Sequence, residues 1–253
     1  MLKKFSNMLR RMKVIIAITI LLSIGAMFTF GKSKATQAFG IHVPAAYSVY
    51  GIDVSRYQQN INWSEVAKAR GGKDNSHTIS FAFIKATEGQ SLVDKHYKEN
   101  WKESKKNKIF RGAYHYYKPN VNSNLQANNF IRTVKLQKGD LPPVLDIEET
   151  GRYGMDNLHR GLQNWLKIIE RHYGVKPIIY CYVDYYDKHF KGKKEYKNYQ
   201  FWIAHHGKLS LRVKEKWHFW QHSDKAKVKG IKGNVCLNVF NGSIKKLNEL
   251  CIK

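Results

Sequence analysis

The chain has 253 residues, and 44 lysines and arginines against 19 acidic residues give a formal net charge of +25. The three cysteines, Cys181, Cys236 and Cys251, cannot all pair, which excludes a disulfide framework and leaves a Cys236–Cys251 bridge open. The charge indicates a polyanionic partner. We expect an anionic cell-wall polymer or a membrane surface and no nucleic acid, because the basic residues are spread along the chain without a recognition motif.

Residues 1–38 differ from the rest of the chain. Lysines and arginines precede an uncharged, mostly apolar run at residues 14–30, and a short polar stretch leads from it to Ala38. This pattern predicts an export signal: a signal peptide, or an N-terminal membrane anchor formed by residues 14–30. The small residues Thr36 and Ala38 favour cleavage near Ala38. In both cases we expect the remainder to be exported across the bacterial inner membrane, to the periplasm or the extracellular space.

Residues 39–253 are predicted to form a single domain, in which short apolar runs alternate with amphipathic ones. The expected strands are 49–55, 80–87, 111–117, 144–148, 177–182, 201–205, 218–222 and 237–240. The expected helices are 64–70, 94–106, 123–136 and 157–173. In the last helix, Asp156 is predicted to cap the start and Gly174 to follow the end.

This alternation predicts an α/β fold, a TIM-like barrel with eight strands and about five helices, (β/α)5(β)3. We expect its strands to be parallel, with few helices in the final third. The competing architecture is a doubly wound open sheet, for which the chain offers no glycine-rich phosphate loop.

Asp146 and Glu148 form the most informative local pattern. They follow Pro143 in a stretch that reads as a buried strand, and alternate residues of a strand point to the same side. Two carboxyl groups that close resist double ionisation, so the pKa of one should rise and leave an acid able to protonate a glycosidic oxygen. The alternative is that these acids are merely solvated or salt-bridged at a strand end.

Further polar and aromatic residues stand near the carboxyl ends of the predicted strands, where barrel enzymes gather their reactive groups. Beside the acid pair they are Asp53, Lys85, Glu88, Tyr114, Tyr116, Tyr180, Trp202, Gln221 and Asn238. Aromatic rings among acids and amides suit a carbohydrate, which offers an apolar face for stacking and hydroxyl groups for hydrogen bonds. The alternative is that these rings are ordinary core or rim residues.

Ten short motifs in order resemble the family 25 glycoside hydrolases, which are lysozymes (N-acetylmuramidases). The motifs are 51–58 (GIDVSRYQ), 62–63 (NW), 81–89 (FAFIKATEG), 111–116 (RGAYHY), 143–148 (PVLDIE), 177–180 (PIIY), 201–204 (FWIA), 220–223 (WQHS), 230–234 (GIKGN) and 237–242 (LNVFNG). The resemblance implies a peptidoglycan hydrolase that cleaves the β-1,4 bond between N-acetylmuramic acid and N-acetylglucosamine. It implies Glu148 as general acid, with Asp146 and Asp53 as its partner carboxylates. It also implies assistance by the substrate's N-acetyl group, and simple inversion remains the alternative.

One position departs from the family pattern, in which an aspartate usually stands where this chain has Cys236. A thiol is mostly uncharged near neutral pH, so one negative charge is missing near the expected sugar site. This motivates an alternative function, a catalytically weakened wall-binding protein of the same fold. We expect no cofactor and no metal, since the histidines at 205, 206, 218 and 222 do not share one strand face, and we expect a monomer.

Overall fold

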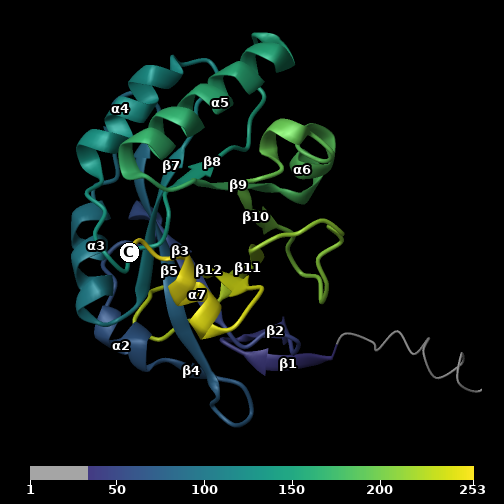
Figure 1. Cartoon of the computed structure of the whole chain (residues 1–253). Coiled ribbons are helices and arrows are strands. Elements are labelled where there is room, and N and C mark those ends of the chain that lie inside the picture. The colour runs from purple at the N-terminus through teal and green to yellow at the C-terminus, as the bar shows by residue number, and fades with distance from the viewer. Residues whose placement is uncertain (1–33) are drawn as a thin grey trace, which may run out of the picture. The chain divides into compact units, whose positions relative to one another are not determined.

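The computed structural model describes residues 34–253, in which eight strands close into a barrel (Figure 1). Around the barrel the strands follow the order β3-β12-β11-β10-β9-β8-β7-β5, and β5 pairs with β3 to complete the circle. Their bounds are β3 (Tyr50–Val54), β5 (His77–Glu88), β7 (Phe110–Tyr116), β8 (Val144–Asp146), β9 (Ile178–Tyr182), β10 (Gln200–Ala204), β11 (Phe219–Ala226) and β12 (Val235–Phe240). The predicted barrel is confirmed, and closure excludes the open sheet.

The expectation that all eight strands run parallel was wrong for β12. This strand is antiparallel to both of its neighbours, β11 and β3, because a short connection returns the chain directly after β11. The amino end of β12 therefore lies where the other strands have their carboxyl ends. As a result Cys236 lies opposite Asp53, while Asn238 lies deeper in the barrel, opposite Gly51.

Five α-helices alternate with the strands from β3 to β10, and Figure 1 shows α3, α4 and α5 around the outside of β5 to β9. They are α2 (Trp63–Lys68), α3 (Tyr97–Lys106), α4 (Ser123–Thr133), α5 (Gly154–Tyr173) and α6 (Val183–His189). No helix separates β10, β11 and β12 in the described chain, as the (β/α)5(β)3 pattern predicts, and α7 (Ile244–Leu250) follows β12. Two short 3-10 helices are η1 (Arg56–Gln58) and η2 (Lys194–Tyr196).

The predicted C-terminal end of α5 is confirmed, and the predicted cap at its start was wrong. Gly174 follows the helix with φ of 70°, a left-handed conformation that glycine adopts without strain. Asp156, however, is not the cap, because the helix already begins at Gly154 and Tyr153 makes no side-chain capping bond. Asp156 instead lies in the first turn, where its charge is favourable toward the helix dipole.

The barrel interior is filled by aromatic rings. Phe81 and Phe83 lie on β5 and point inward, and a Cβ on Gly51 or Gly112 would stand only 2.4 Å or 2.7 Å from these rings. Glycine at these two positions therefore makes room for the rings. Cys251, after α7, belongs to the same interior cluster, which places the C-terminal segment across the amino ends of the strands.

Four short strands were not predicted: β1 (Ala35–Ala38), β2 (Ile41–Pro44), β4 (Arg70–Gly71) and β6 (Leu92–Val93). The β1–β2 hairpin belongs to the same compact unit as the barrel, which extends from Ala35 to Lys253. Ala38 is only 4% exposed, and the backbone N–H of Lys227 donates to the carbonyl oxygen of Phe39 at 2.7 Å. The domain boundary predicted after Ala38 thus falls at the end of a packed strand.

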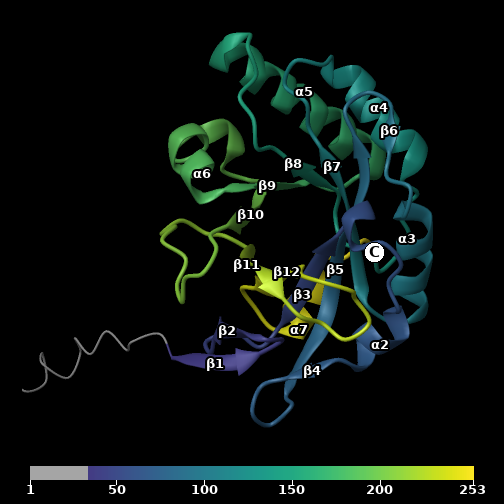
Figure 2. The same cartoon turned by 180° about the vertical axis from the view of Figure 1, so that it is seen from behind.

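The helix-free side of the barrel carries this hairpin and a long loop before β11, as both cartoon views show (Figure 2). The loop and hairpin meet through Tyr47, whose ring lies 5.7 Å from that of Trp217 and 6.0 Å from that of Trp220. They supply apolar cover where a helix is missing.

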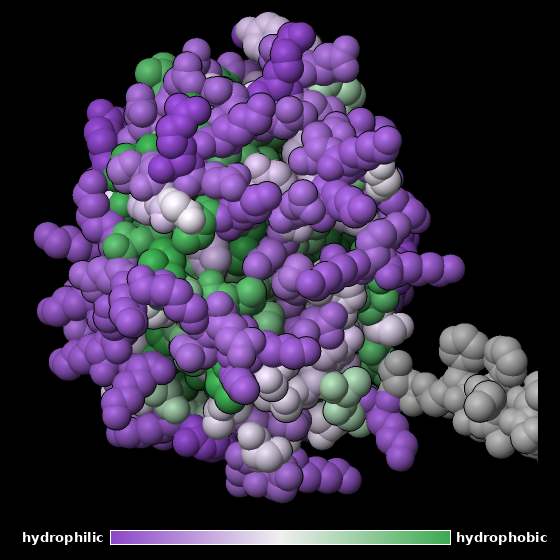
Figure 3. Space-filling view, viewed as in Figure 1, coloured by the Kyte–Doolittle hydropathy of each residue, from purple (hydrophilic) through white to green (hydrophobic). Residues whose placement is uncertain are grey.

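Hydrophilic side chains cover most of the face shown in Figure 3, with apolar residues in the gaps between them. Within residues 34–253 no helix has the length and hydropathy needed to cross a membrane. The apolar run at residues 14–30 lies outside the described residues. All three cysteines are free, so the Cys236–Cys251 bridge is not formed.

Candidate active site

A pocket of about 260 Å³ opens at the end of the barrel that holds Asp53 and the acid pair. Seven of the predicted site residues line it: Asp53, Tyr114, Asp146, Glu148, Tyr180, Trp202 and Gln221. They come from six strands of the barrel wall and from the segment after β8. Residues distant in sequence meet here because parallel strands bring their carboxyl ends to one edge.

The acid pair lies on backbone that is held on both sides. Asp146 ends β8, and its carbonyl oxygen accepts from the N–H of Tyr117 at 2.8 Å, while the N–H of Ile147 donates to the carbonyl oxygen of Tyr180 at 3.0 Å. This pairing keeps the chain extended past the strand end. Both Asp146 and Glu148 consequently face the pocket, as the alternating pattern predicts.

Burial raises the pKa of Asp146 well above its ordinary value, and the neighbouring charge of Glu148 raises it further. Burial also raises the pKa of Glu148, but the hydrogen bond between the two carboxyl groups lowers it. Asp146 is only 6% exposed, and its Oδ1 has no hydrogen-bond partner. Burial and the mutual charge of the two groups thus favour a protonated carboxyl within this pair.

Asp53 lies in a different environment, because amide side chains satisfy one of its oxygen atoms. Its Oδ2 accepts from Nε2 of Gln221 at 2.9 Å and from Nδ2 of Asn238 at 2.8 Å. Both amides are oriented in turn, since Trp202 Nε1 donates to Asn238 at 2.8 Å and the Tyr180 hydroxyl donates to Gln221 at 3.0 Å. Burial raises the pKa of Asp53, and the bonds from Asn238 and Gln221 oppose that rise.

Four predicted binding residues do not line the pocket. Asn238 is fully buried and holds Asp53 in place. Lys85 and Glu88 form an ion pair of 2.7 Å, and the Lys85 ammonium lies 4.8 Å from the centre of the Tyr116 ring. The positive charge of Lys85 lowers the pKa of Asp146, so this group acts on the acid pair electrostatically.

Other lining residues were not in the predicted set. Tyr57 and Gln58 belong to the short helix η1 directly after β3, and the Tyr57 side chain is 74% exposed. His206 follows β10, and its Nε2 lies 2.8 Å from Oε1 of Gln221. Tyr182 ends β9 and is exposed at the rim. The position of Tyr57 just after the strand that carries Asp53 was a usable signal, whereas nothing local marks His206.

Cys236 and Asp224 also line the pocket. Cys236 faces Asp53 across the β12–β3 pair, and burial, followed by the charge of Asp53, raises the pKa of the Cys236 thiol. The thiol is therefore neutral and offers no thiolate nucleophile. Asp224 keeps one further carboxylate at the same pocket.

Among residues 34–253 there is no group of three or more histidine, cysteine or acidic side chains arranged to hold a metal ion. Burial lowers the pKa of His218 and of His222 to about 4, so both are neutral near pH 7.

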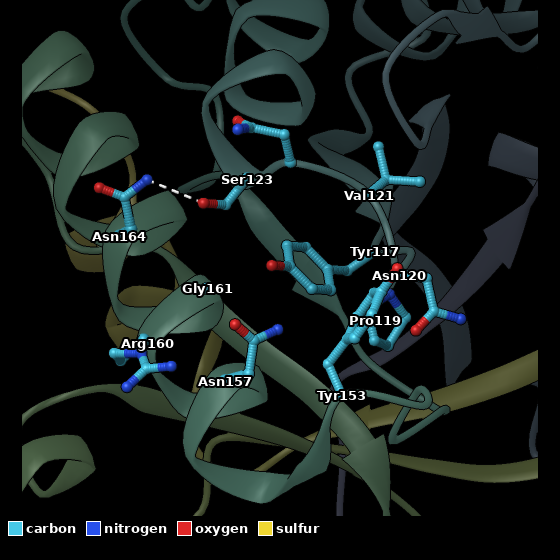
Figure 4. A pocket seen from close by; sticks show the side chains of 11 residues that line it. Tyr117, Pro119, Asn120, Val121, Ser123, Tyr153, Asn157, Arg160, Gly161 and Asn164 are labelled. Atoms are coloured by element: carbon cyan, nitrogen blue, oxygen red, sulfur yellow. Dashed lines mark hydrogen bonds between the residues drawn. The ribbon is translucent and has the colours of Figure 1, made fainter.

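A larger cleft of about 700 Å³ lies between the loop that joins β7 to α4 and the first turns of α5 (Figure 4). Tyr117, Asn157 and Arg160 are among its lining residues, and Gly161 leaves the space that the Tyr117 hydroxyl occupies. None of the residues that line it carries a carboxyl group. Unlike the smaller pocket at the barrel mouth, this cleft offers no carboxyl group for acid–base chemistry.

Comparison with known proteins identifies the family. The model for glycosyl hydrolases family 25 matches residues 52–231. The protein YegX of Escherichia coli (strain K12) is 43% identical over 215 residues, which are 85% of this chain and 77% of YegX. Lysozyme M1 of Streptomyces globisporus is 33% identical over 220 residues, 80% of this chain and 71% of that protein.

Among solved structures, a family 25 glycosyl hydrolase from Bacillus anthracis superimposes with a TM-score of 0.73 at 30% sequence identity. The match covers 88% of this chain and all of that one. The resemblance noted in the ten motifs therefore extends through the barrel and its pocket. The chain belongs to glycosyl hydrolases family 25, and the protein is a glycoside hydrolase of this lysozyme family.

Proposed function

We propose that the protein hydrolyses peptidoglycan as a lysozyme, cutting the β-1,4 bond between N-acetylmuramic acid and N-acetylglucosamine. The observation that carries this proposal is the pair Asp146 and Glu148, whose pKa values are both raised by burial, beside Asp53 in a pocket at the barrel mouth. In the proposal this pair shares one proton, which Asp146 holds before the sugar binds. Similarity to Lysozyme M1 supports it. A wall-binding protein without catalysis is not favoured, because Asp53, Asp146 and Glu148 all line the pocket even though Cys236 replaces the aspartate usual at its position.

The proposed reaction uses the shared proton. When the sugar binds, the N–H of its acetamido group donates to Asp146 and favours the ionised form of that carboxyl, so the proton moves along the hydrogen bond to Glu148. Glu148 then protonates the leaving oxygen while the acetamido oxygen attacks the anomeric carbon. Water next opens this intermediate and gives its proton to Glu148, which restores the pair. In the inverting alternative, water attacks directly, and the anomeric form of the first product distinguishes the two routes.

The other lining residues have binding roles in this proposal. The rings of Tyr114, Tyr180 and Trp202 form an apolar wall, and the exposed rings of Tyr57 and Tyr182 stand at the rim. Such rings stack on the apolar face of a pyranose, while Asp53 faces the positive charge that develops on the sugar. Lys85 lowers the pKa of both carboxyl groups of the acid pair by its positive charge. Its ammonium group is paired with Glu88 and lies next to the ring of Tyr116.

The test compares two neighbouring glutamates on purified peptidoglycan. Glu148→Gln should reduce the release of reducing ends by about 100-fold or more, because it removes the only group proposed to protonate the leaving oxygen. Glu149→Gln is the matched control, since Glu149 pairs with Lys118 at 3.0 Å and does not line the pocket. Mass analysis should find muramic acid at the new reducing end. Equal rates for Glu148→Gln and the wild type would eliminate the proposed acid.

We also propose that residues 1–34 direct export and that the barrel acts outside the inner membrane as a monomer. Its positive charge would hold it at anionic wall polymers or at the membrane surface. Because Ala38 is packed in β1, the exported protein should keep the β1–β2 hairpin. N-terminal sequencing of exported protein should therefore give a start at or before Ala35. A start at Phe39 would contradict this boundary and restore the one predicted from sequence.

A further inference from the structure

A second cleft, of about 480 Å³, adjoins the active pocket and has a basic lining. Its lining residues are Arg56, Tyr57, Gln59, Asn60, Lys95 and His96. Tyr57 lines both this cleft and the active pocket, so the two spaces meet at its exposed ring. No carboxyl group lines the cleft, and within residues 34–253 neither Arg56 nor Lys95 forms a salt bridge.

One buried carboxylate, that of Asp94, holds the two backbone segments that form the cleft. Asp94 is 2% exposed, and its Oδ2 accepts from the backbone N–H of Arg56 while its Oδ1 accepts from the backbone N–H of His96, both at 2.9 Å. The N–H of Asp94 donates to the carbonyl oxygen of Ala86 on β5, also at 2.9 Å. Asp94 thus joins the segment after β3 to the segment after β6. Both of its carboxyl oxygens accept hydrogen bonds from backbone N–H groups.

The loop after η1 is held in a strained conformation. Gln59 has φ of 52° and ψ of −135°, a region that non-glycine residues rarely adopt and that costs about 1–3 kcal/mol. The turn is closed by the Gln59 N–H, which donates to the carbonyl oxygen of Arg56 at 3.1 Å, and by a capping box between Ser55 and Gln58. The side chains of the cleft therefore project from a preformed surface beside the pocket.

We propose that this basic cleft binds the carboxylates on the lactyl–peptide arm of a muramyl residue next to the scissile bond. The inference rests on the proposed function, because it requires a peptidoglycan glycan in the active pocket. A sugar stacked on Tyr57 would carry its substituents toward Arg56, Lys95 and His96. The muramyl arm is the acidic substituent of such a glycan. Its carboxylate is the free lactyl group on a strand without peptides, or belongs to the stem peptide on an intact strand.

The experiment measures kcat/KM on three soluble preparations of glycan strands. One carries stem peptides with free carboxylates, one carries the same peptides after their carboxylates were converted to neutral amides, and one has been stripped of peptides. The wild type should cleave the charged peptide strands about tenfold faster than the amidated ones, since the half-buried Arg56 and the exposed Lys95 each contribute about threefold. Persistence of the high rate on stripped strands shows that the cleft also accepts the free lactyl carboxylate, and its loss shows that the cleft binds the peptide carboxylates alone.

The double variant Arg56→Gln, Lys95→Gln should lose this preference for charged strands through a higher KM, while its rate on amidated strands stays close to that of the wild type. The control Lys167→Gln, Arg171→Gln lowers the net charge equally at exposed positions of α5 and should keep the preference. An unchanged preference in the Arg56, Lys95 variant, or no preference in the wild type, overturns the inference. Failure of the wild type to cleave any of the three preparations would instead overturn the proposed function.

Discussion

Asp53 and Asp146, two aspartates of the site, differ in how their oxygen atoms are satisfied. Oδ2 of Asp53 accepts from two oriented amides, whereas Oδ1 of Asp146 has no partner. Burial raises the pKa of both groups, but the amides oppose the rise at Asp53 while Glu148 adds to it at Asp146. These different surroundings suit the two tasks proposed above, a charge that faces the sugar at Asp53 and a carboxyl that shares a proton at Asp146.

The sharpest test of this difference replaces each aspartate by leucine. Both variants should lose activity on peptidoglycan, by about 100-fold or more. Asp53→Leu should also lower the free energy of unfolding by about 1–3 kcal/mol, because the N–H groups of Gln221 and Asn238 lose their acceptor. Asp146→Leu should leave it unchanged or raise it at neutral pH, because it removes a carboxyl that burial penalises when charged. Urea unfolding measures both values, and equal destabilisation would refute the contrast.

The stability contrast should depend on pH. The pKa of Asp146 is raised in the folded state, so its contribution to stability is complete below its unfolded value of about 3.9 and is lost as pH rises through the folded pKa. The advantage of Asp146→Leu over the wild type should therefore be absent in acid and grow toward neutral pH. An advantage that is constant with pH would show that packing, and not ionisation, causes it.

Replacement of Lys85 should have a smaller effect, on the pH dependence of kcat/KM. Its positive charge lowers the pKa of both Asp146 and Glu148, so Lys85→Gln should raise the pKa of the pair. Activity is lost at high pH when the pair gives up its shared proton, and this alkaline limb should move to higher pH by up to about one unit. The pH dependence of kcat/KM measures the shift. Lys118→Gln is the control. Like Lys85, Lys118 lies next to the ring of Tyr116, but its ion pairs are with Glu88 and Glu149 and its charge is not a cause of the pKa shifts of the acid pair.

The smallest effect concerns Cys236, which faces Asp53. Cys236→Asp would place a second negative charge there and raise the pKa of Asp53, so the acidic limb of kcat/KM should move upward by about half a unit. Cys236→Ser adds no charge and should leave the limb in place. Identical pH profiles for the aspartate and serine variants would mean that solvent screens this position from Asp53.

Local sequence patterns were sufficient for much of the fold and for the centre of the site. The alternation of Leu145, Asp146, Ile147 and Glu148 fixes which side chains share a face, because successive residues of a strand point in opposite directions. Apolar periodicity located all eight barrel strands, and glycine identity located the end of α5 at Gly174. These features depend on residues close together in the chain.

Other features depended on contacts between distant residues and became clear only in three dimensions. The direction of β12 follows from its pairing with β11 and β3. Because β12 is antiparallel, Asn238 is buried behind Asp53 and does not lie at the rim, where the sequence placed it. The pKa of Asp146 is raised because distant segments bury that carboxyl, which its sequence neighbours do not reveal. Sequence by itself determined the strands and the paired acids, since both follow from local geometry. Tertiary structure decided strand direction, the burial of Asp146 and the basic cleft beside Tyr57, since each arises where segments far apart in the chain meet.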